Sequence, residues 1–189
     1  MNSLQDRLIS YLKENFDLDN MEVPEEIREY IKNTPKVPKP EVLSRKAAEK
    51  LALSPFFPNT ALISIRDTDA EALRLKNRPQ WMLSVAFDDI YWDEIDDYEE
   101  DFTFSKEKEE QRIKEAAQKI ADFVADVCDK AEKIICQCEY GQSRSAAVAA
   151  AVREYFYKDG IEIFADDRYC PNKLVFRLTL EALRKKELK

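Results

Sequence analysis

The stretch Ile134-Ile-Cys-Gln-Cys138-Glu-Tyr-Gly141-Gln-Ser-Arg144-Ser145-Ala-Ala-Val-Ala-Ala-Ala151 decides how the rest of this 189-residue chain is interpreted. Its β-branched start predicts a buried strand, and its alanine-rich end predicts a buried helix. A short loop with a glycine, which lets the backbone bend and approach a ligand, joins the two. Backbone N–H groups at a helix start bind anions, and the same field favours the thiolate form of a cysteine. The sequence therefore predicts an anion cradle with Cys138 at its base.

The loop also has the parts that phosphate chemistry requires. Arg144 carries a planar fork of donors that matches the equatorial oxygens of a phosphoryl group. The hydroxyl of Ser145 can donate a hydrogen bond to the sulfur of Cys138. The predicted phosphate-binding residues are Glu139, Tyr140, Gly141, Gln142, Ser143 and Arg144.

The segment Cys138-Glu-Tyr-Gly-Gln-Ser-Arg144-Ser145 resembles the signature loop of the cysteine-dependent protein tyrosine phosphatases, most of all their small dual-specificity branch. The resemblance is strongest from about residue 61 to residue 183 and leaves the first forty residues unexplained. It implies a phosphomonoester hydrolase in which Cys138 forms a phosphocysteine and Arg144 neutralises the phosphoryl oxygens. One position departs from the family, because Gln137 stands where a histidine is usual, and the whole chain has no histidine.

The acid that protonates the leaving group is expected directly after a predicted strand at residues 82–87. Asp88 and Asp89 follow that strand, at the sheet edge where the Cys138 loop should also open. The dual-specificity phosphatases carry their acid on such a loop, so the resemblance favours Asp89 over Asp88. Later acids stay possible, namely Asp93, Glu94, Asp96 and Asp97.

Other residues near the motif have simpler interpretations. The side chain of Glu139 is expected to point outward, because a carboxylate beside a bound dianion is unfavourable. Cys136 shares a strand face with Cys138, and we expect a small buried core residue there rather than a disulfide partner. The aromatic residues that either wall a cleft or only pack are Trp81, Tyr91, Trp92 and Tyr98.

The net charge of −8 is concentrated in one segment. Residues 88–101 hold nine acids and no base, and the remaining 29 acids nearly balance the 30 bases. Nucleic-acid binding requires a basic footprint, so we expect no nucleic-acid partner. The acidic segment also allows another hypothesis, a structural interaction protein that binds a basic partner.

Composition also bears on compartment and cofactors. No apolar run reaches the roughly 18 residues of a membrane helix, and the N-terminus lacks a signal-peptide pattern. We therefore expect a cytoplasmic protein without membrane contact. Four cysteines without any CxxC pair, in a chain without histidine, do not suit zinc, so no metal or other cofactor is expected. A monomer is expected.

Strands that alternate with helices predict an α/β fold, a central and largely parallel sheet flanked by helices. The expected strands are 41–44, 61–65, 82–87 and 133–137. The expected helices are 45–53, 105–130, 144–158 and one that Pro171 opens. Residues 1–40 are expected to form a helical N-terminal extension, with helices at 3–15 and after Pro24 and then a proline-rich linker. Residues 41–189 are expected to form the phosphatase-like catalytic domain.

These observations favour a dual-specificity-type phosphatase that works through a phosphocysteine and needs no metal. The alternative is a non-catalytic phosphate-binding pseudophosphatase module, which the missing family histidine supports. The substrate stays open between phosphotyrosine, phosphoserine or phosphothreonine, a phosphoinositide and a phosphorylated RNA end.

Overall fold

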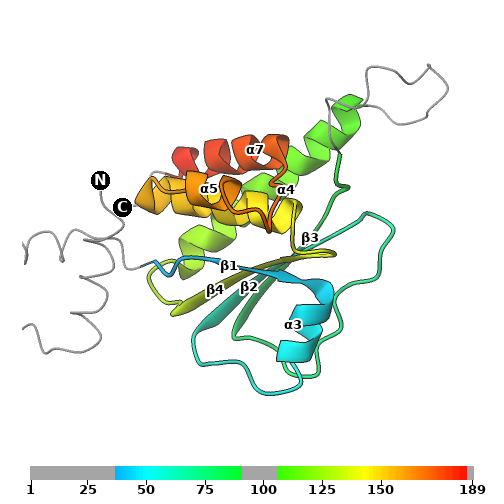
Figure 1. Ribbon diagram of the computed structural model, residues 1–189, viewed down its shortest axis with the longest axis vertical. Coiled ribbons are helices and arrows are strands. Elements are labelled where there is room, and N and C mark those ends of the chain that lie inside the picture. Colours follow the sequence, from blue (N-terminus) through cyan, green and yellow to red (C-terminus); the bar gives the residue numbers. More distant parts are fainter. Residues whose placement is uncertain (1–36, 91–105, 187–189) are drawn as a thin grey trace, which may run out of the picture. The chain divides into compact units, whose positions relative to one another are not determined.

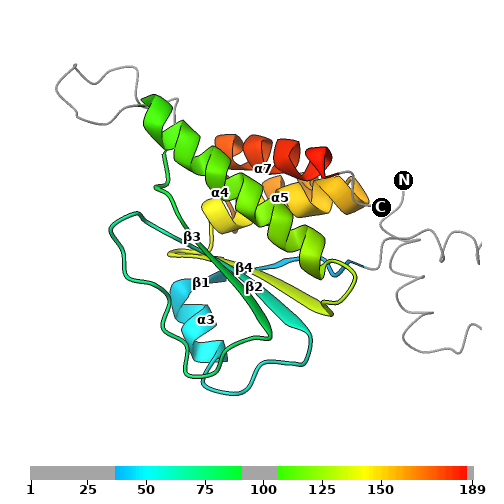
Figure 2. The ribbon, with the colours of Figure 1, turned by 180° about the vertical axis from the view of Figure 1, so that it is seen from behind.

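The computed structural model describes residues 37–90 and 106–186 (Figures 1 and 2). The chain divides into the units Met1–Pro35 and Lys36–Lys189, and all described residues belong to the second unit. The helices expected at residues 3–15 and after Pro24 lie outside the described residues, as do residues 91–101 of the acidic segment. The domain boundary at residue 40 stays a prediction.

A four-stranded parallel sheet forms the centre of the described unit (Figure 1). Its strands are β1 (Glu41–Ser44), β2 (Thr60–Arg66), β3 (Trp81–Ala86) and β4 (Lys133–Cys138). The strand order is β1-β4-β2-β3, so β4 lies between two strands that precede it in the chain. Because all four strands are parallel, their carboxyl ends meet at one edge of the sheet. The predicted fold class, an α/β protein with a parallel sheet flanked by helices, is confirmed.

Helices cover both faces of this sheet. Figures 1 and 2 show α4 (Lys106–Val127), α5 (Arg144–Tyr157) and α7 (Lys173–Lys185) on one face, and α3 (Arg45–Leu51) on the other. A four-residue helix, α6 (Ile161–Phe164), was not predicted. Pro171 was predicted to open the last helix, but the cap is Asn172, whose side chain accepts from the N–H groups of Leu174 and Val175.

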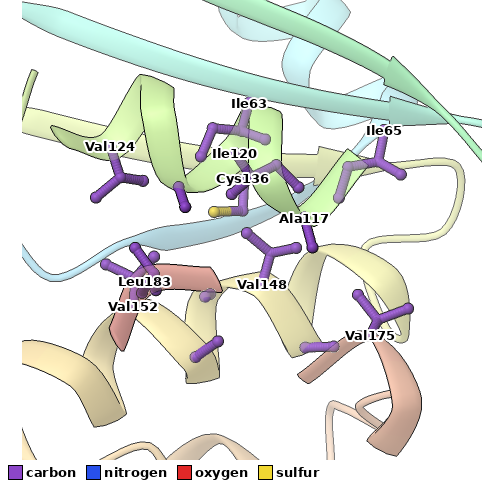
Figure 3. Packing of buried hydrophobic residues seen from close by; sticks show 14 of the residues in the cluster. Ile63, Ile65, Ala117, Ile120, Val124, Cys136, Val148, Val152, Val175 and Leu183 are labelled. Carbon is purple, nitrogen blue, oxygen red and sulfur yellow. The ribbon is translucent and has the colours of Figure 1, made fainter. Parts of the chain in front are cut away.

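The main core fills the space between the sheet and the three-helix layer (Figure 3). Ile63 and Ile65 of β2 contribute from the sheet, and the predicted stripe of α4 is fully buried. That stripe consists of Ile113, Ala117, Ile120, Val124 and Val127. Cys136 is completely buried in this core, and burial raises the pKa of its thiol. The expectation of a small buried core residue at this position is confirmed.

The C-terminal end of α5 is closed by a cluster of charged side chains. Lys158 caps the helix in the left-handed conformation, with φ of 59°. Arg153 donates from Nε and Nη2 to the two carboxylate oxygens of Asp159, each at 2.9 Å. Nζ of Lys39 lies 2.6 Å from the same carboxylate, and Arg153 also pairs with Glu162. Arg153, Asp159 and Lys39 thus each have an opposite charge beside them.

Candidate functional site

The loop that joins β4 to α5 rests on the end of β1 and the start of α3. Gly141 has φ of +70°, and an added Cβ would lie 2.5 Å from the backbone nitrogen of Ser44 and 2.7 Å from the carbonyl carbon of Leu43. Glu139 is bound twice by Arg45, whose N–H donates to the Glu139 carbonyl at 3.1 Å and whose Nε donates to the carboxylate at 2.7 Å. Only a glycine fits at residue 141, because the backbone is left-handed and the space is filled.

This loop encloses a small pocket of about 150 Å³. Its lining residues are Asp89, Cys138, Tyr140, Gln142, Ser143, Arg144 and Cys170. Cys138 lies at the end of β4 with 2% of its surface exposed, and its Sγ is 3.0 Å from Oγ of Ser145. The pocket therefore combines a buried sulfur with the N-terminal end of a helix, where unpaired amides favour an anion.

Arg144 is held in place by groups from two other strand ends. Its side chain is 3% exposed, and its Nη1 lies 2.8 Å from the carbonyl oxygen of Phe87 and 2.8 Å from Oδ1 of Asp67. Its buried Nε makes no hydrogen bond, and Oδ2 of Asp89 is 3.7 Å away from it. A buried donor without an acceptor is costly.

The two candidate acids after β3 point in different directions. Oδ1 of Asp89 accepts from Oγ of Ser143 at 2.8 Å and from Nδ2 of Asn172 at 3.0 Å, which places this carboxylate on the pocket. Asp88 instead accepts from the backbone N–H of Thr68 at 2.8 Å and from its hydroxyl. Neighbouring residues of an extended segment face opposite sides, which explains the difference. The predicted catalytic roles of both acids stay predictions.

Some of the other predicted loop residues line the pocket, and others lie outside it. Glu139 pairs with Arg45 outside the pocket, which agrees with the expected outward orientation. Tyr140 lines the pocket and is 79% exposed. The carbonyl oxygen of Gln142 accepts from the N–H of Cys170 at 3.0 Å, which ties the loop to the segment before α7. Gly141 and Ser143 are buried.

Gln137, at the position of the family histidine, is fully inside the sheet. It is 1% exposed, and its Oε1 accepts from the hydroxyl of Ser64 at 2.7 Å. Its Nε2 has no hydrogen-bond partner. This glutamine therefore joins β4 to β2 one residue before the loop.

Sequence reasoning missed Asp67 and Asn172, which hold Arg144 and Asp89 in place. Asp67 follows β2 in a loop and carried no signal, because one acid on an exposed loop is ordinary. Asn172 had a signal, since an asparagine directly before an apolar helix is a preferred cap. Its second role, the hydrogen bond to Asp89, depends on the fold.

The described residues contain no cluster of three or more histidine, cysteine or acidic side chains that could hold a metal ion. Within the same ranges, no helix is long and apolar enough to cross a membrane.

Comparison with known families finds a similarity in the C-terminal part of the chain. Residues 102–188 match the family model of the Rit1 DUSP-like domain, which belongs to initiator tRNA phosphoribosyl transferase (Init_tRNA_PT). The match includes β4, the Cys138 loop, α5 and α7. No curated protein matches the chain.

This match corrects several predictions. The chain was predicted to belong to the cysteine-dependent tyrosine phosphatases and to be a dual-specificity phosphatase acting through a phosphocysteine; both predictions are wrong. The pseudophosphatase alternative has no support either. The physical reason is that a loop at the start of a helix, with an arginine in it, indicates only that a phosphate group could bind. It does not identify the molecule that carries the phosphate or the reaction.

The prediction that no nucleic acid is a partner also conflicts with this match. The prediction was based on the net charge of the whole chain. That charge includes residues far from any one binding site, so it says little about the charge at the site. A site that recognises one phosphate needs only local donors, and such donors can lie in a chain of negative net charge.

Proposed function

We propose that this chain acts in tRNA modification and that the pocket between Cys138 and Arg144 binds the phosphate of a ribosyl phosphate group on the RNA. The observation that carries the proposal is the buried side chain of Arg144, which lines the pocket together with Cys138. The family match supports the RNA as the carrier of that phosphate.

The size and depth of the pocket favour a terminal phosphate over one within the RNA backbone. A phosphate monoester has three terminal oxygens and up to two negative charges, whereas a backbone phosphodiester has two terminal oxygens and one charge. A pocket of about 150 Å³ with Cys138 at its buried base accepts a group that enters end-on. A phosphoribosyl group presents such a terminal phosphate.

The test is binding of the full chain to initiator tRNA with and without a phosphoribosyl group, measured by filter binding at one fixed salt concentration. We expect the modified tRNA to bind roughly tenfold tighter or more, the effect of one charge-assisted hydrogen bond. Arg144→Lys keeps the charge but loses the planar fork, so it should remove this preference.

Arg184→Lys is the matched control, because Arg184 is exposed in the last turn of α7 and does not line the pocket. It should bind both tRNAs as the wild type does. Equal wild-type affinity for the two tRNAs, unchanged in Arg144→Lys, would contradict the proposed role of the pocket. A chain that binds neither tRNA would contradict the assignment to tRNA.

A further inference from the structure

Tyr140 is an exposed aromatic side chain at the rim of the phosphate pocket. It is 79% exposed although it lies between two residues that are fixed in place. It makes no hydrogen bond, ion pair or ring contact with any residue that the structure describes. The packing of the described residues therefore does not use this ring.

The backbone on both sides of Tyr140 is rigidly held. Glu139 is fixed by the hydrogen bond and the ion pair from Arg45, and Gly141 packs directly against the last residues of β1. The ring therefore has a defined starting point beside the pocket and loses little backbone freedom when a ligand arrives. A rigid anchor with an open aromatic face suits recognition better than it suits packing.

We propose that Tyr140 is a stacking surface for the nucleobase of a nucleotide whose phosphate lies in the pocket. The ligand class is thus a nucleotide with a terminal phosphate monoester, either free or at the end of an RNA, and the inference rests on the phosphate pocket of the proposed function. In a nucleotide, one ribose separates the phosphate from the base, so a phosphate cradle with an aromatic rim matches both ends. Stacking on an aromatic side chain is the usual way in which proteins hold unpaired RNA bases, and it tolerates any base.

The chain offers a matched control for an exposed aromatic ring. Phe57 is 76% exposed, nearly as much as Tyr140, but it precedes β2 and so lies at the opposite edge of the sheet from the pocket. Phe57→Ala therefore removes a ring of similar exposure without touching the proposed site.

The experiment compares ribose 5-phosphate, which has no base, with adenosine 5′-monophosphate by isothermal titration calorimetry. For the wild type we expect the nucleotide to bind roughly tenfold tighter, the effect of one stacked base. Tyr140→Ala should bring the two affinities together, because it weakens binding of the nucleotide by roughly the tenfold that the stacked base contributes. Tyr140→Phe and Phe57→Ala should both keep the difference.

The outcomes separate this inference from the proposed function. If ribose 5-phosphate binds but the nucleotide binds no tighter, or if Tyr140→Ala keeps the difference, the stacking role is overturned and the phosphate pocket stands. If neither compound binds to the wild type, the phosphate pocket is overturned and the stacking role falls with it.

Discussion

The two ends of α5 each lie beside one of the two glycines of the chain, Gly141 and Gly160, and the two glycines serve different purposes. Gly141 has a left-handed backbone and lies in the loop that surrounds the pocket. Gly160 has an ordinary φ of −55°, and an added Cβ would lie 2.5 Å from the carbonyl oxygen of Ala150. The first glycine is required by conformation and space together, and the second by space alone.

The charged groups at the two ends of α5 also differ from each other. At the C-terminal end, Arg153, Asp159 and Lys39 satisfy one another. At the N-terminal end, Arg144 pairs with Asp67 at 2.8 Å and with Asp89 at 3.7 Å, and its buried Nε makes no hydrogen bond. One helix thus carries a charge cluster whose members satisfy one another at one end, and at the other end an arginine with an unbonded Nε beside a pocket.

The largest expected effect is that of Gly141→Ala. A left-handed alanine is strained, and its Cβ would collide with the backbone of β1, so the variant should lose about 3 kcal/mol of unfolding free energy or more. Because the loop must move, ribose 5-phosphate binding should disappear even in molecules that stay folded. Urea denaturation and calorimetry measure the two losses. A stable variant that still binds would show that the loop does not depend on this glycine.

Gly160→Ala should be less harmful and should affect stability alone. Its Cβ would press on Ala150 and on Glu154, an overpacking that costs about 1–3 kcal/mol. The dissociation constant for ribose 5-phosphate should match that of the wild type at temperatures where both are folded. A loss of binding equal to that of Gly141→Ala would remove the distinction between the two ends of α5.

Asp159→Asn tests the closed cluster and should have the smallest effect, about 1 kcal/mol at neutral pH. Burial acts to raise the pKa of Asp159, but hydrogen bonds from Arg153 and Lys39 outweigh it and lower the pKa below 3.8. A lowered pKa stabilises the fold above the unfolded-state pKa, and this contribution is lost as the pH falls through the folded-state pKa.

The difference in unfolding free energy between wild type and Asp159→Asn should therefore shrink as the pH is lowered from about 6 to about 3. Urea denaturation at several pH values measures it. A constant difference over that range would mean that the ion pairs of Asp159 do not stabilise the protein.

The sequence predicted well what depends on neighbouring residues. The strand expected at residues 61–65 extends over Thr60–Arg66, and the one expected at 41–44 has those bounds. Their β-branched and apolar composition was sufficient. The four-residue α6 was missed, because so short a segment shows no helical periodicity.

The site, like the fold, was predictable only where it depends on residues that are neighbours in the sequence. The Cys138 loop is contiguous in sequence, so its position between a strand and a helix could be expected from local signals. Asp67 and Asn172 are brought to it from distant loops by the order of the strands, which no local pattern encodes. Function was the least predictable, because a loop of this kind indicates at most the class of group that could bind and not the molecule that carries it.

The strand order has a consequence for how this protein forms during synthesis. β1 and β2 do not pair with each other, and both pair with β4, so that Glu41 is matched with Ile135 and Thr60 with Lys133. A nascent chain that emerges from its N-terminus can join β2 to β3 early, but β1 has to wait for a partner made much later. Such distant pairings slow folding, since the intervening loop must close first. Insertion of β4 therefore completes the sheet and shapes the Cys138 loop in the same step.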